Sequence, residues 1–348
     1  LGHAGLDRLG HAAHRLDLTA IKGVVTYEPE ELVLTARPGT AIGDIEKLLA
    51  QRGQELAFEP GDWRPWLGEG GDAEGGTLGG AIACNLSGPR RVRAGAARDH
   101  FLGCKGVSGR GEAFKAGGRV VKNVTGYDVC KLLAGSHGTL AALTEITVKV
   151  LPKGEKTRTI LMFGLDDEAA VAALAQAAGS PHDTSGQAHL PAAIARRSSV
   201  AYVGGAGASV TAVRVEGTAV SAAYGCQAPE DMVAPFKVEE LHSANSQAFW
   251  REVRDVAFFA GANDRVLWRL GVPPASAPAV MAAIASALPA EYFLDWGGGL
   301  IWLSLPPHAM AAPTVRSAVG DGHATLMRAP ASMRAAVPVF QAVLNHKL

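Results

Sequence analysis

The sequence predicts an α+β protein with two domains, and three observations support this. At 348 residues the chain is longer than one compact core of ordinary size. A β-α-β pattern, with strand 31–37, helix 40–53 and strand 55–58, predicts a small parallel sheet near the start. Hairpin-like and alternating segments between residues 101 and 150 predict an antiparallel sheet accompanied by helices.

The helix of this β-α-β pattern has recognisable ends. Thr40 precedes it and can cap its first turn, while Gly53 stands where a left-handed C-terminal residue belongs. Its apolar side chains recur at helical spacing and predict a face that packs against the sheet: Ile42, Ile45, Leu48 and Leu49. The preceding strand ends at Pro38 and Gly39.

The later elements of the first domain follow from turn residues and periodicity. Residues 101–107 and 112–116 flank a Ser-Gly-Arg-Gly turn and predict a hairpin. Residues 129–133 predict a short helix ended by Gly135. Residues 146–150 alternate as in a half-buried strand, and Pro152 stops this strand.

Composition and charge exclude several classes of function. Lys plus Arg equals Asp plus Glu at 33 each, so the long-range field that nucleic acid or an anionic membrane would attract is missing. We find no apolar run of membrane-spanning length and no secretory leader. The sequence therefore predicts a cytoplasmic protein that partner subunits could bring to a membrane, and no nucleic-acid partner.

The cysteines and histidines do not predict a metal site. The four cysteines contain no CxxC pair and have no nearby His pair, so neither zinc nor an iron–sulfur cluster is expected: Cys84, Cys104, Cys130 and Cys226. The histidines of the second half are scattered without the spacing of a shared metal: His182, His189, His242, His308 and His323. We expect reduced thiols and no bound metal.

The chain is organised around residues 75–91, GGTLGGAIACNLSGPRR, which contain four glycines in their first six positions. Glycines this dense let backbone N–H groups turn outward and let a phosphate or a ring system approach closely. Taken alone, such a cluster most often marks a surface turn. A second polar loop, Ser-His-Gly-Thr at 136–139, follows the short helix and makes a ligand site more plausible.

Neither glycine segment matches the common nucleotide loops. No GxxxxGK[ST] is present, which disfavours a P-loop NTPase. Residues 204–209, GGAGAS, come nearest to a dinucleotide fingerprint, but the third glycine is absent and residues 210–215 alternate like a strand instead of opening a helix. Dinucleotide binding at this position is therefore disfavoured.

Four segments together resemble the FAD-binding domain of the vanillyl-alcohol oxidase superfamily (PCMH type). They are GTLGGAIACNLSGPRR, RDHFLG at 98–103, KNVTGYD at 122–128 and GSHGTLAALTEITVKVLP at 135–152. Within this superfamily the chain is most similar to the FAD-binding subunits of bacterial glycolate oxidase, the GlcE type. That closer resemblance depends on FEP at 58–60, SGPRR, and FWREVRD, LWRL, DWGGGLIWL and HATLMRAP in the second half.

The resemblance implies FAD as cofactor and names the residues that hold it. The Gly-Thr-Leu-Gly-Gly loop and the following Asn-x-Ser-Gly would bind FAD, and the Ser-x-Gly-Thr-Leu loop would close on it. By position these are Gly76, Thr77, Gly79, Gly80, Asn85, Ser87, Gly88, Gly138, Thr139 and Leu143. Glycine amides and hydroxyls suit the ring carbonyls and phosphates of a flavin. Lys122, Tyr127 and Asp128 are expected to brace the loop, and we interpret the His137 side chain as an ordinary polar loop residue.

The resemblance also sets the expected domain limits. Residues 1–152 would form the PCMH-type domain, 153–327 an α+β cap, and 328–348 a C-terminal tail. Related subunits begin with a strand and an Arg-Gly-Gly-Gly loop for the FAD pyrophosphate, and they end in Asn-Pro-Gly-Arg-Met. This sequence starts after the first feature and stops before the second, so we expect a fragment whose pyrophosphate site is incomplete.

In the second domain we expect helices at 167–178 and 275–288 and strands near 200–203 and 300–305. Stand-alone 2-hydroxy-acid dehydrogenases of this superfamily bring metal-binding histidines and substrate arginines from the cap. Arg251, Arg254 and Arg269 could bind a carboxylate, although the helical spacing of 249–255 equally suits an exposed, ion-paired face. The catalytic residues stay unassigned.

The resemblance implies a function in a complex. The chain would be a subunit of an FAD-dependent oxidoreductase that oxidises glycolate to glyoxylate and passes electrons through flavin to an acceptor other than oxygen. Its partners would be a catalytic flavoprotein subunit and an iron–sulfur subunit. Two alternatives stay open: an independent FAD-dependent dehydrogenase for a 2-hydroxy acid such as D-lactate, and a flavin-free structural subunit.

Overall fold

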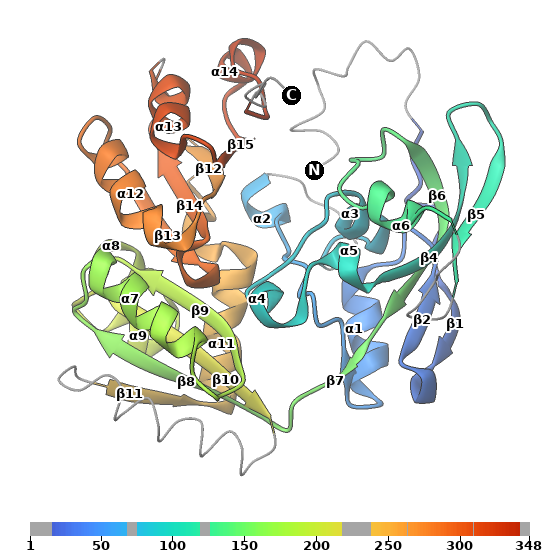
Figure 1. Ribbon diagram of the computed structural model, residues 1–348, viewed down its shortest axis with the longest axis horizontal. Coiled ribbons are helices and arrows are strands. Elements are labelled where there is room, and N and C mark those ends of the chain that lie inside the picture. The colour runs from blue at the N-terminus through green and yellow to red at the C-terminus, as the bar shows by residue number, and fades with distance from the viewer. Residues whose placement is uncertain are drawn as a thin grey trace. The chain divides into compact units, whose positions relative to one another are not determined.

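The computed structural model describes residues 16–67, 75–118, 126–217, 238–262, 264–308 and 310–341. It divides into two compact units, Leu1–Lys153 and Gly154–Leu348 (Figure 1). Each unit has its own sheet and hydrophobic core. No described helix combines the length and the apolar character that crossing a membrane would need.

The first unit is built on a five-stranded sheet in the order β1-β2-β6-β4-β5, and every pair in it is antiparallel. A two-stranded sheet, β3-β7, lies apart from it. The strands are β1 Val24–Glu28, β2 Val33–Ala36, β3 Gln54–Glu55, β4 Phe101–Ser108, β5 Ala113–Gly117, β6 Ala141–Lys149 and β7 Leu151–Pro152. The helices are η1 Pro29–Glu31, α1 Ile42–Ala50, α2 Arg64–Leu67, α3 Leu78–Ala83, α4 Arg91–Ala94, α5 Ala97–His100 and α6 Val129–Leu133.

The predicted parallel sheet is wrong. Strand β2 has β1 and β6 as neighbours, and the buried hydroxyls of Thr35 and Thr147 hydrogen-bond across the β2–β6 pair at 2.8 Å. The strand after α1 is only two residues long, and Gln54 is held by the Tyr27 hydroxyl and by the Pro29 carbonyl. Local sequence predicted the β-α-β elements, but β6, from far along the chain, occupies the position beside β2.

Thr40 does not cap α1. The helix begins at Ile42 after Ala41, and the Thr40 hydroxyl instead donates to the Arg37 carbonyl at 2.7 Å and accepts from the Gly23 amide at 2.9 Å. The predicted apolar face is confirmed, because Ile42, Ile45 and Leu49 are fully buried. The predicted hairpin is also confirmed as β4 and β5.

The second unit is an eight-stranded antiparallel sheet in the order β11-β8-β10-β9-β13-β14-β12-β15. Its strands are β8 Lys156–Phe163, β9 Thr184–Leu190, β10 Val210–Gly217, β11 Val238–His242, β12 Val266–Gly271, β13 Glu291–Asp295, β14 Leu300–Leu305 and β15 His323–Arg328. The longer helices are α7 Asp167–Ala178, α11 Ser243–Asp255, α12 Ala277–Ala285 and α13 Ala311–Val319. Short helical segments complete it: α8 Ala192–Ala195, α9 Ala201–Gly204, η2 Ala257–Phe259, η3 Pro274–Ser276, η4 Trp296–Gly298 and α14 Ala331–Ala336.

Helices cover both faces of this sheet. Val171 of α7, together with residues of α12 and α13, packs against strands β12 to β15 in one cluster. On the opposite face, Trp250 of α11 donates to the Thr159 hydroxyl of β8 at 2.7 Å. The predicted helix 167–178 matches α7, and the predicted strand 300–305 matches β14.

Two predictions for the second half are corrected. Residues 200–203, expected as a strand, enter helix α9, whose turns are closed by bonds such as Gly204 N–H to the Val200 carbonyl. Residues 331–341 of the expected separate tail belong to the second unit, because the Leu326 amide donates to the Val339 carbonyl and Met333 packs on the core. Strand β15 lies at the edge of the sheet, so the backbone carbonyls and amides on its outer side favour this attachment.

Candidate functional site

The glycine-rich loop before α3 is fixed to the turn after β2. The Gly79 amide donates to the Pro38 carbonyl at 2.8 Å, and the Leu78 amide donates to the Thr40 carbonyl at 2.9 Å. A Cβ on Gly79 would lie 2.7 Å from Pro38 Cβ, so this close approach requires glycine. Gly79 therefore serves the packing of α3 against the neighbouring turn.

Gly76, Thr77 and Gly80 form the more accessible part of the loop. Gly76 has a φ of +77° with nothing within 4 Å of the position of a Cβ, and Gly80 is exposed. Thr77 is the N-cap of α3, and its Oγ1 accepts from the Gly80 amide at 3.2 Å. This backbone leaves room for a ligand to approach without meeting side chains.

The Asn-x-Ser-Gly segment after α3 is tied to the start of α5. Asn85, at φ +50°, accepts from the Arg98 amide through Oδ1 at 3.0 Å, and Ser87 Oγ accepts from the Ala97 amide at 3.1 Å. Gly88 is buried, and its amide donates to the Phe58 carbonyl at 2.9 Å. These polar groups fix the chain around α3.

The second predicted loop docks on the C-terminal end of α3. The Gly135 amide donates to the Ile82 carbonyl at 3.1 Å, and the His137 amide donates to the Ala83 carbonyl at 2.8 Å. The structure thus brings the two segments together within one unit. The contacts are between backbone atoms, and they also satisfy carbonyls at the end of a short helix.

Within this second loop the predicted residues differ in exposure. Gly138, at φ +73°, and Thr139 are exposed, and nothing lies within 4 Å of a Cβ placed on Gly138. The Thr139 hydroxyl donates to the Ser136 carbonyl at 2.7 Å. Leu143 is only 8% exposed and belongs to the hydrophobic core, so its side chain supports the loop from below. Burial lowers the pKa of His137.

The loop-bracing residues are partly described. Asp128 caps α6 by accepting from the Lys131 amide at 3.1 Å, which agrees with a bracing role. Tyr127 is 96% exposed, and Lys122 lies outside the described residues.

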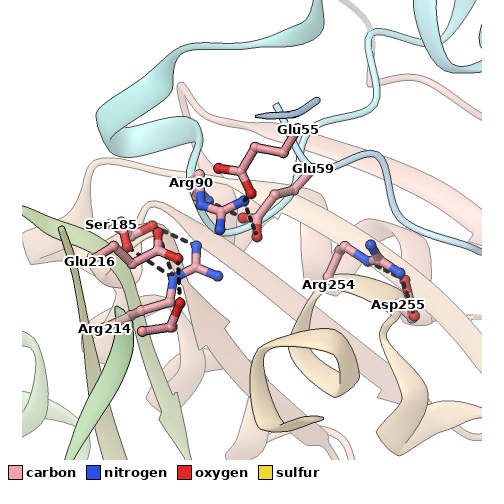
Figure 2. Close-up of polar contacts among 9 residues, drawn as sticks. Glu55, Glu59, Arg90, Ser185, Arg214, Glu216, Arg254 and Asp255 are labelled. Carbon is pink, nitrogen blue, oxygen red and sulfur yellow. Dashed lines mark hydrogen bonds and ion pairs between the residues drawn. The ribbon is translucent and has the colours of Figure 1, made fainter. Parts of the chain in front are cut away.

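An ion-pair cluster links two motifs that the sequence presented separately. Arg90, which follows Gly88, lies 3.2 Å from Glu55 and 3.1 Å from Glu59, and its amide also donates to Glu59 at 2.8 Å (Figure 2). Glu59 has a φ of +46°. FEP and SGPRR therefore meet at one point, and the pairing holds the segment after α3 in position.

Sequence reasoning missed one part of this region, the turn at Pro38–Gly39. A Cβ on Gly39 would lie 2.3 Å from the Thr19 carbonyl oxygen, and the Gly39 amide donates to the Ile21 carbonyl. Residues 18–23 are thereby fixed beside the glycine-rich loop. The Pro-Gly pair was visible in the sequence, but it was interpreted only as the end of a strand.

The candidate residues of the second unit have structural contacts. Arg254 pairs with Asp255 at 2.8 Å (Figure 2), Arg251 is exposed, and the Arg269 guanidinium lies 5.1 Å from the Trp296 ring centroid. His189 is buried between Thr211 and Asp167. Across the ranges that the structure describes, no three His, Cys, Asp or Glu side chains converge as a metal site would require.

The arrangement in the first unit fits a flavin nucleotide. Gly76 and Gly138 both have a positive φ, and nothing lies within 4 Å of a Cβ placed on either residue. Thr77 and Thr139 follow these glycines in the chain and add hydroxyls without charge. Such a surface admits a flat ring system and a phosphate.

Comparison with known proteins identifies the family of the chain. Residues 5–117 match a family described as an FAD binding domain. The chain is 34% identical over 312 residues to the glycolate oxidase subunit GlcE of Escherichia coli, covering 89% of this chain and 75% of that protein. It is 31% identical over 138 residues to the glycolate oxidase subunit GlcD of Bacillus subtilis, covering 40% of this chain and 27% of that protein.

A D-lactate dehydrogenase of Anaerostipes hadrus is 29% identical over 147 residues, or 42% of this chain and 29% of that protein. Among solved structures, an alkyldihydroxyacetonephosphate synthase superposes with a TM-score of 0.64 at 17% identity, over 87% of this chain and 62% of the other. The predicted α+β fold with an FAD-binding domain is thereby confirmed.

Proposed function

Because the chain belongs to the family of GlcE-type glycolate oxidase subunits, we propose that it is the FAD-binding subunit of a glycolate-oxidising complex. The complex would convert glycolate to glyoxylate and pass the electrons to an acceptor other than oxygen. The observation that supports this proposal is the docking of the 135–139 loop on the carbonyls that end α3, which would form one wall of the proposed flavin site in the first unit.

The proposed flavin contacts come from the two loops. Gly76, Thr77 and Gly80 on one side, and Gly138 and Thr139 on the other, would present backbone and hydroxyl groups to the cofactor. Five further residues would act indirectly, because their contacts with neighbouring residues hold the two loops in shape: Gly79, Asn85, Ser87, Gly88 and Leu143. When bound, FAD supplies a two-electron acceptor for oxidation of the alcohol.

The proposed partners are a catalytic flavoprotein subunit and an iron–sulfur subunit. The name of the Bacillus subtilis relative, a GlcD subunit of glycolate oxidase, supports the first of these. We place the assembly in the cytoplasm, with any membrane association supplied by the partners.

The test compares the chain alone with the complex. The chain is purified by itself and with the products of neighbouring genes, flavin absorbance is recorded, and dye reduction is assayed with glycolate and with D-lactate. We expect flavin in the complex and glycolate-dependent turnover only when the partners are present.

Similarity to D-lactate dehydrogenases supports one second candidate, an independent FAD-dependent 2-hydroxy-acid dehydrogenase. Turnover by the chain alone would replace the subunit proposal with this one. Absence of flavin even from an active complex would instead favour a flavin-free structural subunit.

A further inference from the structure

Two cysteines of the first unit lie against one backbone carbonyl. Cys104 of β4 stands opposite Ala116 in the β4–β5 register, and Cys130 of α6 donates to the Ala116 carbonyl with Sγ at 3.8 Å. Elements distant in sequence thus place two buried thiols beside the same stretch of β5, and neither thiol is used by the proposed flavin site.

The surroundings of the pair are shaped to admit sulfur. A Cβ on Gly117, which has a φ of +66°, would lie 3.0 Å from Cys130 Sγ. Cys104 is 5% exposed and Cys130 is 2% exposed, so apolar packing surrounds both. Cys130 is itself part of helix α6, which has only five residues. A helix this short opens at low cost and then admits a small reagent.

The two thiols differ in acidity. The neighbouring Cys130 thiol lowers the pKa of Cys104, whereas the interaction with Cys104 and burial raise the pKa of Cys130. The thiolate is the reactive form of cysteine, so Cys104 is the nucleophile of the pair. Cys84 contrasts with it, because burial raises the pKa of that thiol to about 11.

We infer that Cys104 and Cys130 are a reversible redox pair that hydrogen peroxide converts to a disulfide joining β4 to α6. The Cys104 thiolate attacks one peroxide oxygen, the O–O bond breaks, and a sulfenic acid and, after protonation, water form. Cys130 sulfur then attacks the Cys104 sulfur, forming the S–S bond and releasing the hydroxyl as a second water. Each sulfur loses one electron, and the peroxide gains two.

The disulfide would stabilise the position of α6. This helix leads directly into the loop whose Gly135 and His137 amides dock on α3, so the bond would hold the loop's base against the sheet. The inference concerns the two thiols and does not depend on the identity of the substrate.

The experiment uses the full chain without reductant. After treatment with hydrogen peroxide, remaining thiols are blocked with N-ethylmaleimide and the protein is digested with trypsin without reduction. Cleavage after Arg98, Lys105, Lys122 and Lys131 releases peptides 99–105 and 123–131, each with one cysteine. We expect these peptides joined, with a mass two hydrogens below their sum, and separated again by dithiothreitol.

A double variant, Cys84→Ser with Cys226→Ser, leaves only the two thiols of interest and should give the same joined peptide. Cys104→Ser is the matched control and should leave Cys130 fully blocked by N-ethylmaleimide. Three results would overturn the inference. The two peptides could stay separate with both cysteines blocked, or each cysteine could carry its own oxygen adduct. In the natural chain, either cysteine could instead be bonded to Cys84 or Cys226.

Discussion

At Thr77, one hydroxyl has two roles that can be separated by mutation. It caps α3 through the Gly80 amide, and it borders the open space beside Gly76. Thr77→Val keeps the shape of the side chain but removes the acceptor, so we expect a loss of about 1 kcal/mol in unfolding free energy and a clear fall in the flavin content of the purified complex.

The matched control for Thr77 is Asp166, which caps α7 by accepting from the Ala169 amide at 2.8 Å in the second unit. Asp166→Ala should cost similar stability and leave the flavin absorbance per polypeptide unchanged. Equal flavin content in the two variants would remove Thr77 from the proposed site. Gly80→Leu, which adds bulk at an exposed position next to the Thr77 hydroxyl, should lower flavin content in the same way.

Packing around Gly186 leaves no room for a side chain larger than hydrogen. A Cβ there would lie 2.9 Å from the ring of Trp250 and 3.1 Å from Nε of Arg214. Arg214 is itself buried and hydrogen-bonds to Ser185 (Figure 2). Its guanidinium lies 4.8 Å from the Trp250 ring centroid. We expect Gly186→Ala to lower the unfolding free energy by about 1–3 kcal/mol in denaturant titration, as overpacking does.

Gly109 is the comparison for this change, because it stands in the β4–β5 turn with nothing within 4 Å of a Cβ position. Gly109→Ala should leave the denaturation midpoint almost unchanged. If Gly186→Ala were equally harmless, the contact with Trp250 would be looser than the structure has it.

At the scale of elements, sequence patterns predicted local structure better than pairing. Helix α7 has the predicted limits because its capping acid and its apolar repeat are all within twelve residues. The parallel sheet failed because β6 reaches β2 from more than a hundred residues away. No local pattern specifies which strand takes that position.

In the candidate site, too, the sequence predicted local features but not the contacts between distant segments. The glycine and hydroxyl residues of both loops were predicted from the resemblance to FAD-binding domains, and residues of these types suit close approach of a ligand to the backbone. Their junction could not be predicted, because Gly135 and His137 dock through amides that nearly every residue carries. The Pro38 contact that requires Gly79 is equally invisible without the fold.

The start of α7 is joined to two strands by one carboxylate. Asp167 accepts from the Tyr292 hydroxyl of β13 at 2.5 Å and lies 3.2 Å from Nε2 of His189 on β9. Burial raises the pKa of Asp167, but the bonds from His189 and Tyr292 outweigh it and hold the pKa below its ordinary value. The same contact and burial raise the pKa of Tyr292.

A pKa that is lower in the folded state means that the ionised carboxylate stabilises the fold. This stabilisation is complete above the unfolded value of about 4 and is lost as pH falls through the lower, folded value. We expect Asp167→Asn to flatten the fall of the melting temperature below about pH 4 while lowering it at neutral pH. If the melting temperature of the variant fell with pH as steeply as that of the natural chain, other carboxylates would govern acid unfolding.

At the scale of the whole molecule, each unit has a hydrophobic cluster of its own. Ile146 belongs to the first core and Ile301 to the second. Separate cores predict separate unfolding events, because apolar burial is the main stabilising term for each unit. We expect two transitions in calorimetry of the full chain.

Substitutions in the two cores assign these transitions. Ile146→Val and Ile301→Val each remove one buried methylene and should cost about 0.5–1.5 kcal/mol. Each should lower the midpoint of its own transition, while added FAD should raise only the transition that Ile146→Val lowers, since a ligand stabilises the unit that binds it. If both substitutions move one common transition by the same amount, the two units unfold as a single cooperative structure.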